Sequence, residues 1–124
     1  MEDLLIQNAY IIDGTGTPGF PGTLSVRDGR ISGIWRQAAH RTPARETLDA
    51  GGNVLCPGFV DTHTHSDMIL LHDGRQPSSI TQGVTTEILG QDGLSYAPLS
   101  PDLLSSYAKY LKGIDGAFDD VTLD

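Results

Sequence analysis

The chain has 124 residues, of which 38% are hydrophobic, and its formal net charge is −8. This length suits one modest domain, and the acidic balance argues against nucleic acid or an anionic membrane surface as a partner. The single cysteine, Cys56, excludes an internal disulfide, and no leader-like or long apolar segment is evident. We therefore expect a soluble, cytoplasmic protein.

The first fifty residues predict short strands joined by glycine turns. Residues 4–12 are rich in β-formers and end at a turn-prone cluster, 13–16. Residues 23–27 and 30–35 flank Asp28-Gly29, a dipeptide that tolerates positive φ at both positions and predicts a hairpin. Residues 40–46 are polar and basic and contain a proline, so an exposed loop is expected there.

Strands alternate with helices in the second half. A strand is expected over 59–65, a short helix over 78–83 and a second strand over 84–89. A longer helix should begin with Ser100 as N-cap and Pro101 at the first helical position, and should end at Gly113 or Gly116. This order indicates parallel βα units. Two such units cannot close a barrel, which needs roughly 200 residues, so the chain is expected to be a fragment.

The segment 59–67 carries the strongest chemical signal in the chain. On a strand, side chains two positions apart share a face, so His63 and His65 would lie about 6–7 Å apart. Asp61 would share that face, as would Asp67 if the strand continued. Neutral imidazole suits zinc and similar ions, and the C-terminal end of a parallel strand is where sites form. The two histidines are therefore predicted to bind a metal ion.

Residues 49–67, with Pro57-Gly58-Phe59-Val60-Asp61-Thr62-His63-Thr64-His65 at their core, resemble the entry strand of the amidohydrolase superfamily. Residues 82–98 narrow this resemblance to the N-acyl-D-amino-acid deacylases (D-aminoacylases). In that family a Gln-Gly-Val-Thr-Thr strand, here 82–86, precedes a Gly-Asn-Cys-Gly loop, and this chain has Gly90-Gln91-Asp92-Gly93 at that place. The similarity extends from residue 4 to about residue 114.

The resemblance implies an α/β fold, namely a metal-dependent (β/α)8 TIM barrel preceded by a small β-sandwich module. Residues 1–54 would form the N-terminal part of the sandwich domain. Residues 55–124 would form the first βα units of an incomplete barrel.

The same resemblance implies a metal centre with one or two divalent ions, zinc being the expected metal. His63 and His65 match the strand-one ligands, and Asp92 stands where D-aminoacylases have a metal-binding cysteine. A carboxylate is a harder ligand than a thiolate, so it shifts the preference toward other divalent ions. The alternative for Asp92 is a turn residue before Gly93.

Three further residues are candidates close to the metal ions or the substrate. Asp61 could orient a ligand histidine or could hydrogen-bond backbone near the strand. Asp67 is a second acidic neighbour, and Ser95 follows the loop, where it would touch substrate or pack.

The implied activity is hydrolysis of the amide of an N-acyl-D-amino acid to a carboxylate and a D-amino acid. The family's general-base aspartate is expected beyond residue 124, so no catalytic residue is assigned here. We expect the isolated chain to lack appreciable activity and to aggregate, because an unfinished sheet leaves an edge and apolar faces uncovered.

Two alternatives remain open from sequence. One is a cyclic-amide amidohydrolase of the dihydroorotase or hydantoinase kind, and the other is a truncated, non-catalytic remnant. For the deacylase and for the cyclic-amide hydrolase alike, the expected partner is a small-molecule substrate. The sequence leaves the acyl group, the side-chain specificity, the number of metal ions and the oligomeric state undetermined.

Overall fold

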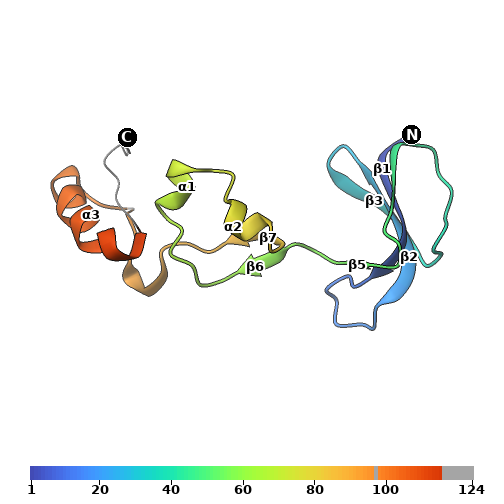
Figure 1. Cartoon of the computed structure of the whole chain (residues 1–124), viewed down its shortest axis with the longest axis horizontal. Coiled ribbons are helices and arrows are strands. Elements are labelled where there is room, and N and C mark those ends of the chain that lie inside the picture. The colour runs from blue at the N-terminus through green and yellow to red at the C-terminus, as the bar shows by residue number, and fades with distance from the viewer. Residues whose placement is uncertain (97, 116–124) are drawn as a thin grey trace. The chain divides into compact units, whose positions relative to one another are not determined.

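The computed structural model describes residues 1–96 and 98–115, and the chain divides into two compact units after Pro57 (Figure 1). The first unit is all β, and the second combines short strands with helices. The fold is therefore mixed α and β, as expected. No helix among the described residues is long and apolar enough to cross a membrane.

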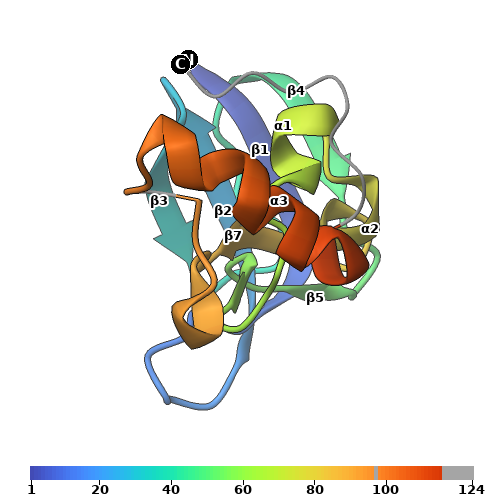
Figure 2. The ribbon, with the colours of Figure 1, turned by 90° about the vertical axis from the view of Figure 1, so that its left-hand side faces the viewer.

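The first unit is a five-stranded sheet with the order β3-β2-β1-β4, in which β5 also pairs with β1 (Figure 2). Its strands are β1 (Glu2–Ile11), β2 (Phe20–Arg27), β3 (Arg30–Trp35), β4 (Ala44–Asp49) and β5 (Val54–Leu55). β1, β2 and β3 are antiparallel neighbours, whereas β4 and β5 run parallel to β1. The unit supplies this one sheet, so its place in a β-sandwich stays a prediction.

The hairpin between β2 and β3 confirms the prediction made from Asp28-Gly29. Arg27 pairs with Arg30 across the turn, and the two central residues have φ values of 52° and 70°. Both central positions of a type I′ turn need positive φ, which aspartate tolerates and glycine adopts freely. Local turn chemistry therefore fixes the register of this hairpin.

The predicted loop over 40–46 is wrong at its end, because β4 begins at Ala44. The strand is polar and mostly exposed, so its sequence carries little sign of a β-structure. Its extended conformation is stabilised by pairing with β1. In this parallel ladder Leu4 opposes Glu46 and Ile6 opposes Leu48. Tertiary pairing overrides local propensity here.

The core of the first unit is formed by side chains of the neighbouring strands β1 and β2. Ala9, Ile11, Phe20 and Leu24 are buried together, each at most 9% exposed. Ile11 opposes Phe20 directly in the antiparallel ladder. Consecutive strands thus bury their apolar residues against each other.

The second unit contains a parallel pair of strands, β6 and β7. Its elements are β6 (Phe59–Asp61), α1 (Ile69–His72), α2 (Pro77–Ile80), β7 (Val84–Glu87), the 3₁₀ turn η1 (Gln91–Gly93) and α3 (Pro101–Asp115). The predicted parallel arrangement is confirmed, whereas α1 was not predicted. Parallel strands joined through helices are compatible with a barrel, which itself stays a prediction.

α3 begins at Pro101 as predicted, and the amides of Leu103 and Leu104 donate to the Ser100 carbonyl. It continues through Gly113 to Asp115, so Gly113 does not end it, and Gly116 lies outside the described residues. Leu111 on the predicted apolar stripe is completely buried, but Leu103 is 58% exposed. Part of the stripe is therefore uncovered.

Candidate metal centre

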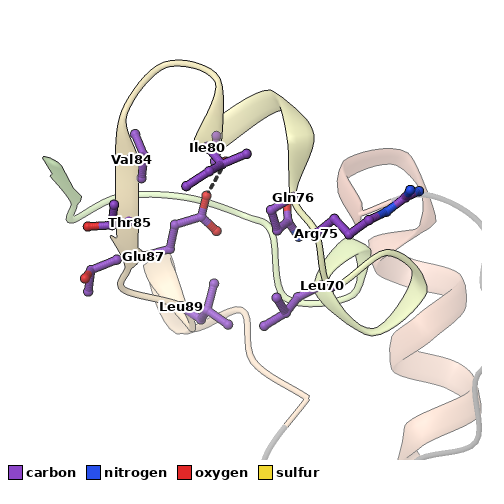
Figure 3. A pocket seen from close by; sticks show the side chains of 11 residues that line it. Leu70, Arg75, Gln76, Ile80, Val84, Thr85, Glu87 and Leu89 are labelled. Atoms are coloured by element: carbon purple, nitrogen blue, oxygen red, sulfur yellow. Dashed lines mark hydrogen bonds between the residues drawn. The ribbon is translucent and has the colours of Figure 1, made fainter. Parts of the chain in front are cut away.

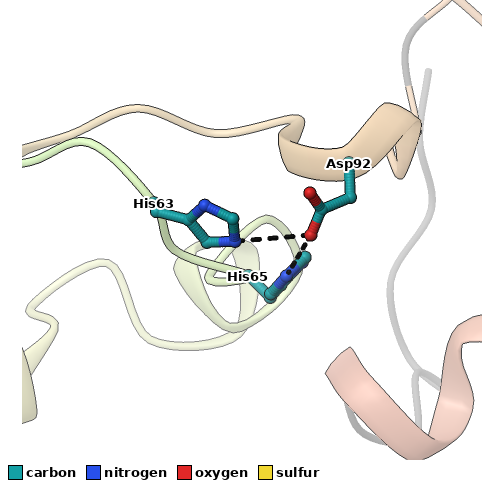
Figure 4. Close-up of side chains that lie close together, drawn as sticks. All are labelled: His63, His65 and Asp92. Carbon is teal, nitrogen blue, oxygen red and sulfur yellow. Dashed lines mark ion pairs between the residues drawn. The ribbon is translucent and has the colours of Figure 1, made fainter.

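His63, His65 and Asp92 converge in the second unit (Figure 4). Asp92 Oδ2 lies 3.3 Å from His63 Nε2 and 3.5 Å from His65 Nε2. The three candidate ligand atoms all lie within 4.8 Å of one another. The two imidazole rings are 5.6 Å apart between centroids and nearly perpendicular, at 78°. The structure thus brings together the three residues that the sequence singled out as ligands.

The two histidines do not lie on a strand, which corrects the prediction of a strand over 59–65. β6 ends at Asp61, and the backbone amide of His63 donates to Asp61 Oδ1 at 3.0 Å. This side-chain contact two residues ahead is an Asx-type turn, which diverts the chain from the extended path. The alternation argument therefore does not apply, although both rings still reach the same carboxylate.

All three side chains follow the C-terminal ends of neighbouring parallel strands. The histidines follow β6, and Asp92 lies in η1, which follows β7. The last ladder contact before the strands diverge runs from the Ile88 amide to the Asp61 carbonyl, at 2.8 Å. Adjacent strand ends are the usual position of a site in parallel α/β folds.

The turn that presents Asp92 has an unusual backbone. Gly90, Asp92 and Gly93 have φ values of 74°, 57° and 74°. Aspartate is one of the few non-glycine residues that adopt this left-handed region readily, and such conformations gather at functional sites. Asp92 is therefore both a turn residue and a member of the cluster, so the two readings left open by the sequence are compatible.

The donor set fits a zinc-like ion. With zinc–ligand bonds of about 2.0–2.2 Å, a tetrahedral site has neighbouring ligands roughly 3.3–3.5 Å apart. The separations of Asp92 Oδ2 from His63 Nε2 and His65 Nε2, 3.3 and 3.5 Å, match that spacing, and all three candidate ligand atoms lie within 4.8 Å of one another. His65 is 29% exposed in its side chain, whereas His63 and Asp92 are 62% and 60% exposed. Three protein ligands and this exposure leave room for further ligands.

Two of the other predicted site residues, Asp61 and Asp67, accept hydrogen bonds from backbone amides. Asp61 accepts from the His63 amide, which is the backbone role that the sequence left open. Asp67 Oδ1 accepts from the Gly90 amide at 3.2 Å. The Ser95 amide lies 3.2 Å from the Tyr107 hydroxyl, and Tyr107 also donates to the Gly93 carbonyl at 3.2 Å. The assignment of these residues to a substrate site stays a prediction.

Gly90 is a residue that the sequence did not single out. Its left-handed backbone opens η1, and its amide contacts Asp67, 23 residues away. A glycine before Gln91-Asp92-Gly93 is a visible turn signal, but its partner could not be read from the sequence.

A separate pocket of about 290 Å³ lies between α2 and β7 (Figure 3). Glu87 reaches across it and accepts a hydrogen bond from Ser79. Gln76 also lines the pocket, and its buried Nε2 has no hydrogen-bond partner among the residues that the structure describes. None of the three ligand candidates lines this pocket.

Known proteins resemble the chain in sequence. An N-acyl-D-aspartate deacylase of Alcaligenes xylosoxydans xylosoxydans is 44% identical over 98 residues, which are 79% of this chain and 19% of the relative. The chain therefore spans about a fifth of that relative. No protein-family profile matches the chain.

Solved structures of deacylases also resemble this chain. The zinc complex of N-acyl-D-glutamate deacylase from Bordetella bronchiseptica matches 91% of this chain and 27% of its own length, with a TM-score of 0.73 and 34% identity. A D-aminoacylase that defines a subset of amidohydrolases matches 90% of this chain and 27% of its own length, with a TM-score of 0.74 and 35% identity.

A more distant match supplies a contrast. The L-hydantoinase of Arthrobacter aurescens covers 94% of this chain with a TM-score of 0.61 and 26% identity, and the chain covers 25% of it. The sequence identity and the TM-score are both lower than for the two deacylases. In sequence and in structure, the chain is thus related to the N-terminal part of the N-acyl-D-amino-acid deacylases of the amidohydrolase superfamily.

Proposed function

We propose that this chain supplies the N-terminal part of a metal-dependent hydrolase that cleaves non-peptide C–N amide bonds. The substrates would be N-acyl-D-amino acids, and the products a carboxylate and a D-amino acid. The observation that carries the proposal is the convergence of His63, His65 and Asp92 in a chain 44% identical to an N-acyl-D-aspartate deacylase.

The three converging side chains are proposed to hold a zinc ion through two imidazole Nε2 atoms and one carboxylate oxygen. The chemistry that zinc supplies when bound is polarisation of a carbonyl group and a lowered pKa for a water molecule. The chain's own contribution is to fix two neutral donors and one anionic donor at the ends of adjacent strands. A carboxylate in place of a thiolate also makes the site more tolerant of harder divalent ions.

The fold proposal follows from the same relationship. Residues 1–54 would belong to the small β-sandwich domain, and 55–124 to the first βα units of a (β/α)8 barrel. The parallel pairing of β6 with β7 supports the barrel assignment. The exposed Phe59 and Val60 of β6, at 58% and 56%, support it as well, because barrel strands are covered on both faces.

The isolated chain is proposed to be inactive. Its cluster offers three metal ligands, and the resemblance leads us to expect the general base outside residues 1–124. Metal binding without turnover is therefore the expected behaviour of residues 1–124 alone. Measurable release of a D-amino acid by the purified chain would overturn this point.

A cyclic-amide hydrolase is the second candidate, favoured by the structural match to L-hydantoinase. The linear-amide assignment has the stronger support, because the deacylases match at higher identity and higher TM-score. The third possibility, a non-catalytic remnant, would keep the fold and the metal ligands without an activity.

The decisive experiment uses the natural gene product that carries this sequence, purified and supplied with Zn²⁺. It is incubated with N-acetyl-D-amino acids, with their L-enantiomers as matched controls, and with hydantoin and dihydroorotate. Free amino acids and ring-opened N-carbamoyl products are both measured by chromatography. We expect release from D-substrates only. Ring opening without deacylation would favour the cyclic-amide enzyme, and no turnover of any substrate would favour the remnant.

A further inference from the structure

Asp67 connects the two segments that carry the metal ligands. Its carboxylate oxygens Oδ1 and Oδ2 lie 3.2 and 3.5 Å from the backbone nitrogen of Gly90. Asp67 follows His65 by two residues, and Gly90 precedes Asp92 by two residues. One hydrogen bond therefore joins the histidine segment to the aspartate turn, close to the ligands themselves.

This contact lies beyond the end of the strand pairing. The Ile88 amide still reaches the Asp61 carbonyl, at 2.8 Å, but the chain then turns at the left-handed Gly90. From that point the position of Asp92 depends on how the turn is held. The carboxylate of Asp67 supplies the acceptor oxygen for the Gly90 amide, and a neutral side-chain carbonyl at that position can accept from the same amide.

Asp67 is not itself one of the converging ligands. Among the described residues, the group whose ligand atoms lie within 4.8 Å of one another consists of His63, His65 and Asp92. Both Asp67 oxygens are directed at the Gly90 amide instead. Its geometry is that of a residue that fixes the distance between ligands.

We propose that Asp67 is a positioning residue, which latches the Gly90 turn to the histidine segment and thereby holds the Asp92 carboxylate at His63 and His65. The effect on metal binding rests on the proposed function, whereas the latch is a property of the metal-free chain. The hydrogen bond needs an acceptor oxygen at position 67 and does not need a negative charge on that side chain.

The metal arm of the test compares Asp67→Ala with Asp67→Asn in the full 124-residue chain, by titration with Co²⁺ and visible absorption. Alanine removes the acceptor, whereas asparagine keeps one. Because loss of a supporting residue weakens metal sites by about 10–100-fold, we expect about a 10-fold or greater loss for Asp67→Ala, and affinity within about 3-fold of the parent for Asp67→Asn. The d–d absorption bands should shift in Asp67→Ala only.

Either of two results would overturn the metal arm. Equal losses in both variants would mean that the charge of Asp67 matters, as for a direct ligand. Unchanged affinity in Asp67→Ala would mean that the turn is held without it. His63→Ala serves as the positive control, and the helical circular dichroism of the second unit verifies that each variant is folded.

The metal-free arm separates failure of the latch from failure of the proposed function. Amide hydrogen exchange at Gly90, followed by NMR without metal, should be slow in the parent and in Asp67→Asn and fast in Asp67→Ala. Fast exchange in the parent would refute the latch. Slow exchange in a parent chain that binds neither Co²⁺ nor Zn²⁺ would support the latch and refute the metal site.

Discussion

Apolar residues are treated differently in the two units of this chain. In the first unit, Ile11 and Ala9 are each 2% exposed and pack with Phe20 and Leu24. In the second, β6 leaves Phe59 and Val60 more than half exposed, and the described buried hydrophobics are Met68 and Leu111. The unit with the candidate metal centre is thus the one with the less complete core.

The difference follows from strand topology. Antiparallel strands joined by short turns bury each other's apolar residues within a few dozen residues of chain. Parallel strands need cover on both faces, and further strands and helices normally supply it. The first unit can therefore be stabilised locally, while the second unit places its ligands at strand ends whose faces remain open.

The largest expected effect is on the metal centre of the second unit. His63→Ala removes one of three ligands, so the Zn²⁺ affinity of the chain should fall by more than about 100-fold, beyond the usual loss for a supporting residue. Competition with a chromophoric chelator measures it. His40→Ala is the matched control, because His40 stacks on Trp35 at 4.0 Å in the first unit. Equal effects of the two substitutions would contradict the assignment.

The second-largest effect is expected from a core substitution, which should lower the stability of the first unit more than a comparable substitution lowers that of the second. Ile11→Ala removes a buried side chain of the first unit, and the free energy of unfolding should fall by about 2–5 kcal/mol. Urea titration followed by Trp35 fluorescence reports on that unit. Phe59→Ala should change the free energy of unfolding of the second unit by less than about 1 kcal/mol. The helical circular dichroism of that unit follows its unfolding. A larger loss for Phe59 would mean that β6 is well covered.

A smaller effect is expected at the hairpin turn. Gly29 has a φ of 70° and open space around it. Gly29→Ala should therefore lower the stability of the first unit by about 1–2 kcal/mol, through backbone strain rather than a clash. Gly74→Ala, followed by the helical circular dichroism of the second unit to which Gly74 belongs, is the control, since Gly74 is not among the residues with positive φ. No difference between these two variants would contradict the type I′ turn.

The smallest effect concerns pH and again falls on the first unit. Hydrogen bonding from Ser32, and then from Arg27, lowers the pKa of the Glu2 carboxyl below its ordinary 4.5. Because the folded pKa is the lower one, this contribution to stability is present above pH 4.5 and is lost as the pH falls through the folded value. Glu2→Gln should flatten the acid limb of the stability profile seen by Trp35 fluorescence. An unchanged limb would contradict the role of Glu2.

Sequence patterns predicted the features that depend on neighbouring residues. Asp28-Gly29 indicated its hairpin, and Ser100-Pro101 indicated the start of α3, because turns and caps are encoded locally. β4 escaped prediction because its polar sequence is extended only through pairing with β1.

The candidate site was predicted in its residues and not in its geometry. His63, His65 and Asp92 were identified by motif, but Asp61 ends the strand before the histidines by accepting the His63 amide. The contact of Asp67 with Gly90 joins residues 23 positions apart, and no local pattern encodes it.

The most direct test of the central claim is X-ray absorption spectroscopy of the chain loaded with one equivalent of Zn²⁺. We predict scattering from two imidazole nitrogens and a carboxylate oxygen at about 2.0–2.2 Å, with the imidazole signal halved in His63→Ala. A zinc ion surrounded only by oxygen, with a spectrum that His63→Ala leaves unchanged, would contradict the claim that these three residues share one cation.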